Sequence, residues 1–70
     1  MRLQFQFYLD TPEGPRIEAE TVLYSSTTLD QAIKGAKRML RERTFYFGKA
    51  NLCIIKDQGG RVIREVRSRK

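Results

Sequence analysis

Leu-Cys-Ile-Ile-Lys-Asp-Gln-Gly-Gly occupies residues 52–60. The unbroken apolar run at 52–55 is typical of a strand buried on both faces of a sheet, and therefore of a central strand. The paired glycines that follow are expected to supply the positive φ angles that a tight hairpin requires. Residues 61–67 are then the returning strand, and their arginines favour a place at the edge of the sheet.

The start of the chain predicts a β-hairpin. Its first strand alternates polar residues with the apolar residues Leu3, Phe5, Phe7 and Leu9. Turn formers are concentrated at residues 10–15, and alternation resumes over residues 16–24. The residues expected on one side of this second strand are Ile17, Ala19, Thr21 and Leu23.

A helix is expected between the two hairpins, from about Leu29 to about Arg43. Thr28 is a candidate N-cap, and Gln31 completes a capping-box pattern. Gly35 costs about 1 kcal/mol relative to alanine in a helix, and a close approach of helix to sheet would explain it. The predicted core-facing stripe consists of Leu29, Ala32, Ile33, Ala36, Met39 and Leu40.

Together these elements predict an α+β fold, ββαββ, forming one domain over residues 1–70. Chain direction gives a four-stranded antiparallel sheet of order 2-1-3-4, with the helix packed on one face. Because one helix covers one face, we expect self-association, as a homodimer, either through the open face with Tyr8, Val22 and Tyr24 or through an edge strand. Residues 68–70 are expected to be a frayed basic tail.

Charge is segregated along the chain. Residues 1–33 carry two basic and five acidic groups, whereas residues 34–70 carry twelve basic and three acidic groups, within a net charge of +6. A clustered positive field attracts phosphate-rich polymers or acidic surfaces.

The first basic cluster is a ridge on the helix. Helical spacing places Lys34, Lys37, Arg38 and Arg41 within one arc, which could follow a phosphate backbone. The alternative is a solvated face, in which Asp30 pairs with Lys34 and Glu42 pairs with Arg38.

The second basic cluster occupies the last strand and the tail. Arginine suits phosphate contact, but basic side chains on an edge strand also prevent aggregation, so both interpretations stay open. The cluster consists of Arg61, Arg64, Arg67, Arg69 and Lys70, and all but Arg61 are candidate nucleic-acid-binding residues.

Composition argues against several kinds of chemistry. The chain has no histidine and one cysteine, Cys53, which lies in the apolar run and is expected to be buried. We therefore expect no enzymatic activity, cofactor, metal site or small-molecule substrate. No apolar stretch approaches the roughly 20 residues of a membrane span, so we expect a cytoplasmic protein without a membrane partner. The aromatic triplet at residues 45–47 is interpreted as packing, with at most one ring displayed.

Three stretches carry a resemblance to known proteins. They are Phe5-Gln6-Phe7-Tyr8-Leu9-Asp10, Leu29-Asp30-Gln31-Ala32, and Asp57-Gln58-Gly59-Gly60 followed by Arg61-Val62. The chain resembles a family of small uncharacterised bacterial ββαββ domains that have an aromatic first strand ending in Asp, a Leu-x-x-Ala helix and a final hairpin near Asp-x-x-Gly. The resemblance implies no activity and no site residues.

Two functions follow from the sequence. The first is a non-enzymatic interaction module that self-associates. The alternative is a nucleic-acid-binding accessory protein that uses the helix ridge and the arginine-rich last strand.

Overall fold

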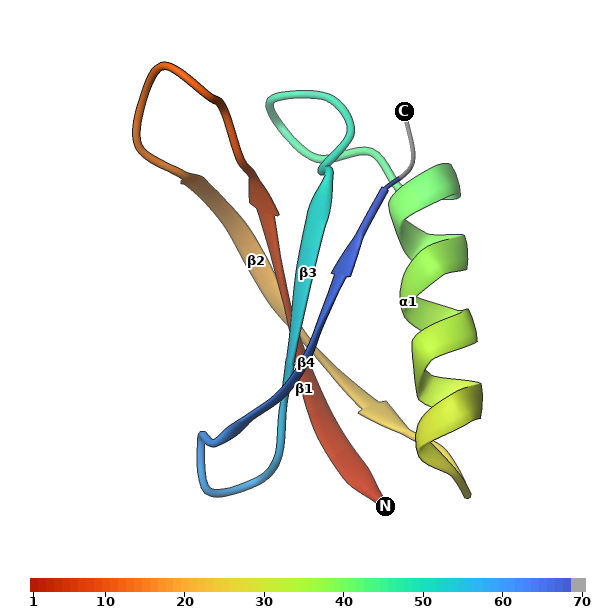
Figure 1. The fold of residues 1–70 in the computed structure, drawn as a ribbon. Coiled ribbons are helices and arrows are strands. Elements are labelled where there is room, and N and C mark those ends of the chain that lie inside the picture. Colours follow the sequence, from red (N-terminus) through yellow and green to blue (C-terminus); the bar gives the residue numbers. More distant parts are fainter. Residues whose placement is uncertain (69–70) are drawn as a thin grey trace.

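A computed structural model describes residues 1–68 and confirms the ββαββ order. The sheet has the order β2-β1-β3-β4, with every neighbouring pair antiparallel, and α1 covers one face (Figure 1). The elements are β1 (Arg2–Leu9), β2 (Ile17–Ser25), α1 (Leu29–Glu42), β3 (Leu52–Lys56) and β4 (Val62–Arg67).

The core lies between α1 and the two central strands. Phe5 pairs with Ile55 and Phe7 pairs with Cys53, and all four side chains are fully buried on the helix side. On the opposite face of β3, Leu52 is also fully buried and Ile54 is 7% exposed. Burial on both faces of β3 confirms the central place that its apolar run predicts.

The helix begins as expected. The Thr28 hydroxyl accepts a hydrogen bond from the Gln31 backbone N–H (3.2 Å), which satisfies a donor left free at the helix start. The Gln31 side chain instead accepts a hydrogen bond from the Thr27 hydroxyl, so only half of the capping box forms. The predicted apolar stripe is confirmed, with Ala32, Ala36 and Leu40 buried and its other members packed against the core.

In the turn between β3 and β4, only one of the two glycines has the positive φ angle that was expected of both. Gly60 has a φ of +88°, whereas Gly59 has no positive φ. The Asp57 carboxylate accepts hydrogen bonds from the backbone N–H groups of Gly59 and Arg61, both at 2.9 Å. This side chain organises the turn, so a second left-handed residue is not needed.

A β-bulge in β2 corrects the predicted faces of that strand. Between the pairs Gln6–Thr21 and Tyr8–Glu18, β1 advances by two residues and β2 by three. The extra residue reverses the alternation, because each position beyond it changes face. Val22 and Tyr24 therefore pair with Phe5 and Leu3 and pack against the core.

Because of this bulge, the predicted placement on the open face is wrong for two of the three residues proposed for self-association. Tyr8 lies on the open face as expected, but Val22 and Tyr24 do not. Thr21 and Leu23, expected on the core side, lie on the open face, where Leu23 is 78% exposed.

The segment after α1 folds back on itself. Phe45 and Gly48 exchange two backbone hydrogen bonds, and Gly48 has a φ of +105°. Phe45 packs on Phe7 in the core and Phe47 is partly buried against it, whereas Tyr46 is 79% exposed. The prediction that at most one ring of the aromatic triplet is displayed is confirmed.

Ser68, the described part of the predicted tail, is held by a hydrogen bond from its N–H to the Asn51 carbonyl (2.9 Å). Arg69 and Lys70 lie outside the described residues. Within residues 1–68, no helix has both the length and the apolar character that crossing a bilayer requires.

Candidate functional site

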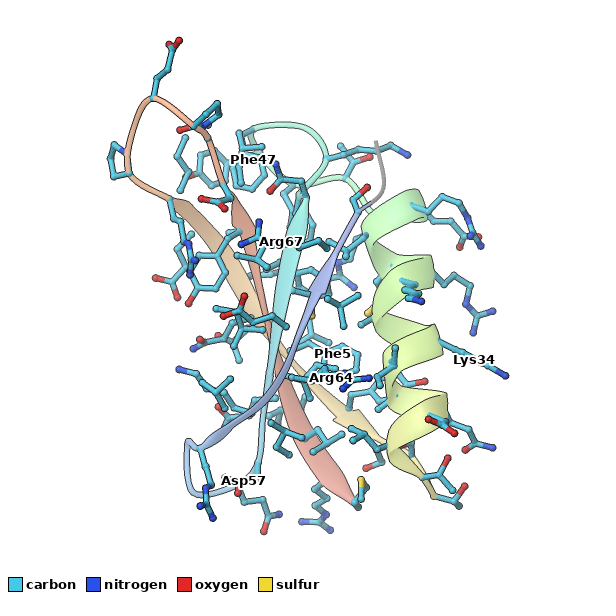
Figure 2. All side chains as sticks on the ribbon, viewed as in Figure 1. Phe5, Lys34, Phe47, Asp57, Arg64 and Arg67 are labelled. Carbon is cyan, nitrogen blue, oxygen red and sulfur yellow. The ribbon has the colours of Figure 1, made fainter. Side chains whose placement is uncertain are left out.

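The two sequence-predicted basic clusters meet only in part. Helix α1 lies along β4 (Figure 1). A β4 side chain on the helix side of the sheet therefore lies next to α1, whereas one on the opposite face does not. Arg64 pairs with the core residue Ile55 and lies on this side, beside the helix (Figure 2). Arg67 pairs with Leu52 and lies on the opposite face of the sheet.

Arg67 is occupied by carboxylates. Its guanidinium lies 2.9 Å from an Asp10 carboxylate oxygen and 3.9 Å from a Glu65 carboxylate oxygen. The hydrogen bond from Arg67 lowers the pKa of Asp10 below its ordinary value, and Arg16, 3.5 Å away, reinforces the effect. Arg67 therefore joins the β1–β2 turn to β4 on the open face, away from the helix.

The helix ridge presents its cations to solvent. Lys34, Lys37, Arg38 and Arg41 are all exposed, and Lys34 points away from the sheet (Figure 2). Neither of the carboxylate pairs that a solvated face would allow, Asp30–Lys34 and Glu42–Arg38, is formed among residues 1–68. Glu42 instead lies 3.8 Å from Arg41.

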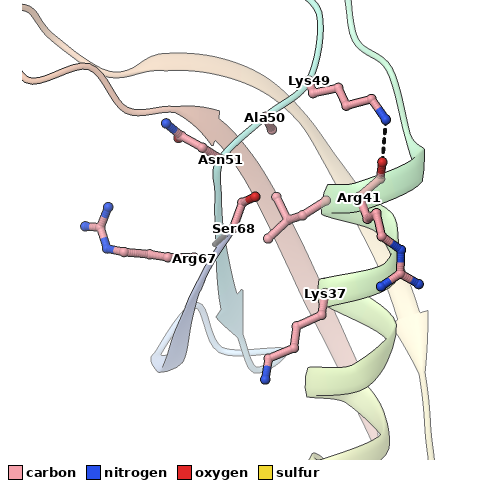
Figure 3. A pocket seen from close by; sticks show the side chains of 8 residues that line it. Lys37, Arg41, Lys49, Ala50, Asn51, Arg67 and Ser68 are labelled. Carbon is pink, nitrogen blue, oxygen red and sulfur yellow. Dashed lines mark hydrogen bonds between the residues drawn. The ribbon is translucent and has the colours of Figure 1, made fainter. Parts of the chain in front are cut away.

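A hollow of about 880 Å³ borders the ridge on the β4 side (Figure 3). Leu40 and Ala50, both nearly fully buried, contribute apolar surface to it. The Lys49 ammonium donates a hydrogen bond to the Arg41 carbonyl at the end of α1. The Arg67 side chain extends away from the hollow, so this residue does not bring its charge into it (Figure 3).

Lys49 is a basic residue of this surface that the sequence analysis missed. It follows the aromatic segment, outside both basic clusters, and reaches the helix only because Phe45 and Gly48 close that segment into a turn. The one signal in the sequence was a lysine directly after a glycine in a short connection.

A second groove, of about 420 Å³, borders the ridge on the β2 side. Here the Tyr24 ring stacks on Phe5, with ring centroids 4.6 Å apart, and its hydroxyl lies over Gly35. Among residues 1–68, no side chain that lines this groove carries a carboxylate. The lining consists of Tyr24, Gln31, Lys34, Gly35, Arg38 and Arg41.

Cys53 has the inert environment that its apolar strand predicts. Its side chain is fully buried, and burial raises the pKa of the thiol to about 12. The reactive thiolate form is therefore scarce at neutral pH.

Comparison of the chain with known protein families, curated proteins and solved structures gives no significant match.

Proposed function

We propose that this protein binds nucleic acid through the outer face of α1, with the phosphate backbone following the ridge of Lys34, Lys37, Arg38 and Arg41. The observation that carries the proposal is that Lys34, Lys37 and Arg38 have no carboxylate partner among residues 1–68. Unpaired surface cations can exchange bound counterions for phosphates without first breaking an ion pair.

The ridge is long enough to contact a short stretch of a nucleic-acid phosphate backbone. Lys34 and Arg41 are separated by two turns of helix, or about 10 Å along the helix axis. Arg64 from β4 lies on the same side of the sheet, and Lys49 stands at the end of the helix. These residues support contacts to successive phosphates.

Self-association through the open face has weaker support. Leu23 and Val62 are exposed apolar residues of the open face, and they belong to the opposite edge strands β2 and β4. Between them the apolar residues of β3 are already buried, so these two side chains do not form one contiguous patch. An interaction module that self-associates stays a prediction from the sequence.

The test is a titration of fluorescein-labelled single-stranded and duplex DNA and RNA of about 20 nucleotides at several salt concentrations. The expected result is steeply salt-dependent binding. The triple variant K34Q/K37Q/R38Q should weaken it and reduce the slope of log K against log salt by about 2–3.

A matched control removes three cations elsewhere. The variant R2Q/K56Q/R61Q has the same net charge as the ridge variant, but its substitutions lie in β1, at the end of β3 and in the last turn. Equal losses in both variants would show that net charge alone attracts the polymer. No binding by the wild-type protein at low salt would overturn the proposal.

A further inference from the structure

The Tyr24 hydroxyl is placed beside the ridge by a glycine. A Cβ on Gly35 would lie 2.5 Å from this hydroxyl oxygen and 2.8 Å from the ring carbon that bears it. Such distances are far below van der Waals contact, so the ring can occupy this position only because residue 35 has no side chain. Gly35 is buried within the helix, where glycine is otherwise unfavourable.

The hydroxyl is available for a ligand. Among residues 1–68 it makes no hydrogen bond, whereas the Tyr8 hydroxyl on the other face donates to the Gln6 side chain (2.9 Å). The Tyr24 ring itself is fixed by its stack on Phe5. A fixed donor with no protein acceptor therefore lies at the rim of the β2-side groove.

The other polar groups of this groove are also hydrogen-bond donors or cations. Lys34 and Arg38 bring positive charge, and the amide of Gln31 retains its N–H donors because its oxygen accepts from Thr27. Donors and cations without a carboxylate form an environment that favours an anion with several acceptor oxygens.

We propose that this groove seats one phosphodiester group of the bound nucleic acid, with the Tyr24 hydroxyl donating to a non-bridging oxygen and Lys34 and Arg38 flanking it. This inference rests on the proposed function and names one contact within it. Gly35 then has a role beyond packing, because the absence of a side chain there lets the Tyr24 hydroxyl lie between Lys34 and Arg38.

The test compares Tyr24→Phe with wild type in the same nucleic-acid titration. The substitution keeps the ring, the stack on Phe5 and the protein's charge, and removes only the hydroxyl. The expected result is an affinity about tenfold lower, since hydrogen bonds to charged groups are among the stronger ones. The salt slope should stay unchanged, because a hydroxyl releases no counterion.

Tyr8→Phe is the matched control, because it removes a tyrosine hydroxyl from the open face. It should bind as wild type does, and thermal unfolding should confirm that both variants are folded. Wild-type affinity for Tyr24→Phe, with the ridge variant still impaired, would overturn the subsite and leave the proposed function standing. Failure of the wild-type protein to bind would overturn both.

A further experiment tests whether the ligand of the groove is a phosphate of the polymer or a free phosphate ion. Inorganic phosphate at constant ionic strength should displace the labelled strand only weakly, because one phosphate ion replaces one contact whereas the polymer makes several linked contacts. Strong displacement by inorganic phosphate that is lost in Tyr24→Phe would assign the groove to the free anion and overturn the phosphodiester assignment.

Discussion

Tyr24 and Gly35 are in direct contact across the interface between β2 and α1. The ring of Tyr24 occupies the space that any side chain at residue 35 would need, and its other contacts include the stack on Phe5. The pair explains why a helix with a well-formed cap and a regular apolar stripe retains a glycine near its middle.

Gly35→Ala should therefore destabilise the protein, by about 1–2 kcal/mol, although alanine is the better helix former by about 1 kcal/mol. The added Cβ would displace the Tyr24 ring and disturb its stack on Phe5. Urea denaturation of the variant and of wild type measures the difference.

The Tyr24→Ala background provides the control for this prediction. The atoms that a Cβ at residue 35 would meet most closely all belong to Tyr24, so removing that ring should make Gly35→Ala stabilising by about 1 kcal/mol. An equal effect of Gly35→Ala in both backgrounds would contradict the contact.

Cys53 should be protected from thiol reagents in the folded protein. Its burial raises the pKa of the thiol to about 12, so little thiolate exists at about pH 8 and the reagent has no access to it. Reaction with a disulfide reagent such as DTNB should be on the order of 100-fold slower, or more, than in denaturing urea. A native rate close to that of the unfolded chain would show that β3 opens readily.

The ion pair between Asp10 and Arg67 should make stability depend on acid pH. Because the folded pKa of Asp10 lies below its ordinary value of 3.8, its contribution is present above that value. The contribution is lost as the pH falls through the lowered folded pKa. We expect the urea midpoint to fall as the pH is lowered from about 5 to about 2, and to fall less in Arg67→Gln.

Arg2→Gln is the control for this pH dependence, because Arg2 is exposed at the opposite end of β1 from Asp10. Among residues 1–68, Arg2 forms no ion pair. The variant should show the same fall in the urea midpoint as wild type. If Arg67→Gln behaves like Arg2→Gln, the ion pair with Arg67 does not lower the pKa of Asp10.

Local patterns predicted the helix and the strand order well. The cap at Thr28 and the apolar stripe of α1 depend on residues within a few positions of each other, and the burial of β3 follows from its composition. Strand directions then left few arrangements for the sheet.

The faces of β2 could not be predicted in the same way. One extra residue opposite β1 reverses the side on which Val22 and Tyr24 lie, and the sequence of β2 alternates acceptably in either phase. The register was decided by pairing with Phe5 and Leu3, which are distant in the chain.

The candidate site, which is built from the basic residues of the segment 34–70, was also predicted only in part. The sequence by itself determined the ββαββ order, the core of the central strands and the ridge on α1, because short-range periodicity encodes each of them. Only the tertiary structure decided that Arg64 lies on the helix side, that Arg67 is held by Asp10, and that Tyr24 reaches the ridge over Gly35. Those outcomes depend on the register of β4 on β3, on the β-bulge in β2 and on side-chain packing between elements far apart in the chain, which periodicity within one element does not specify.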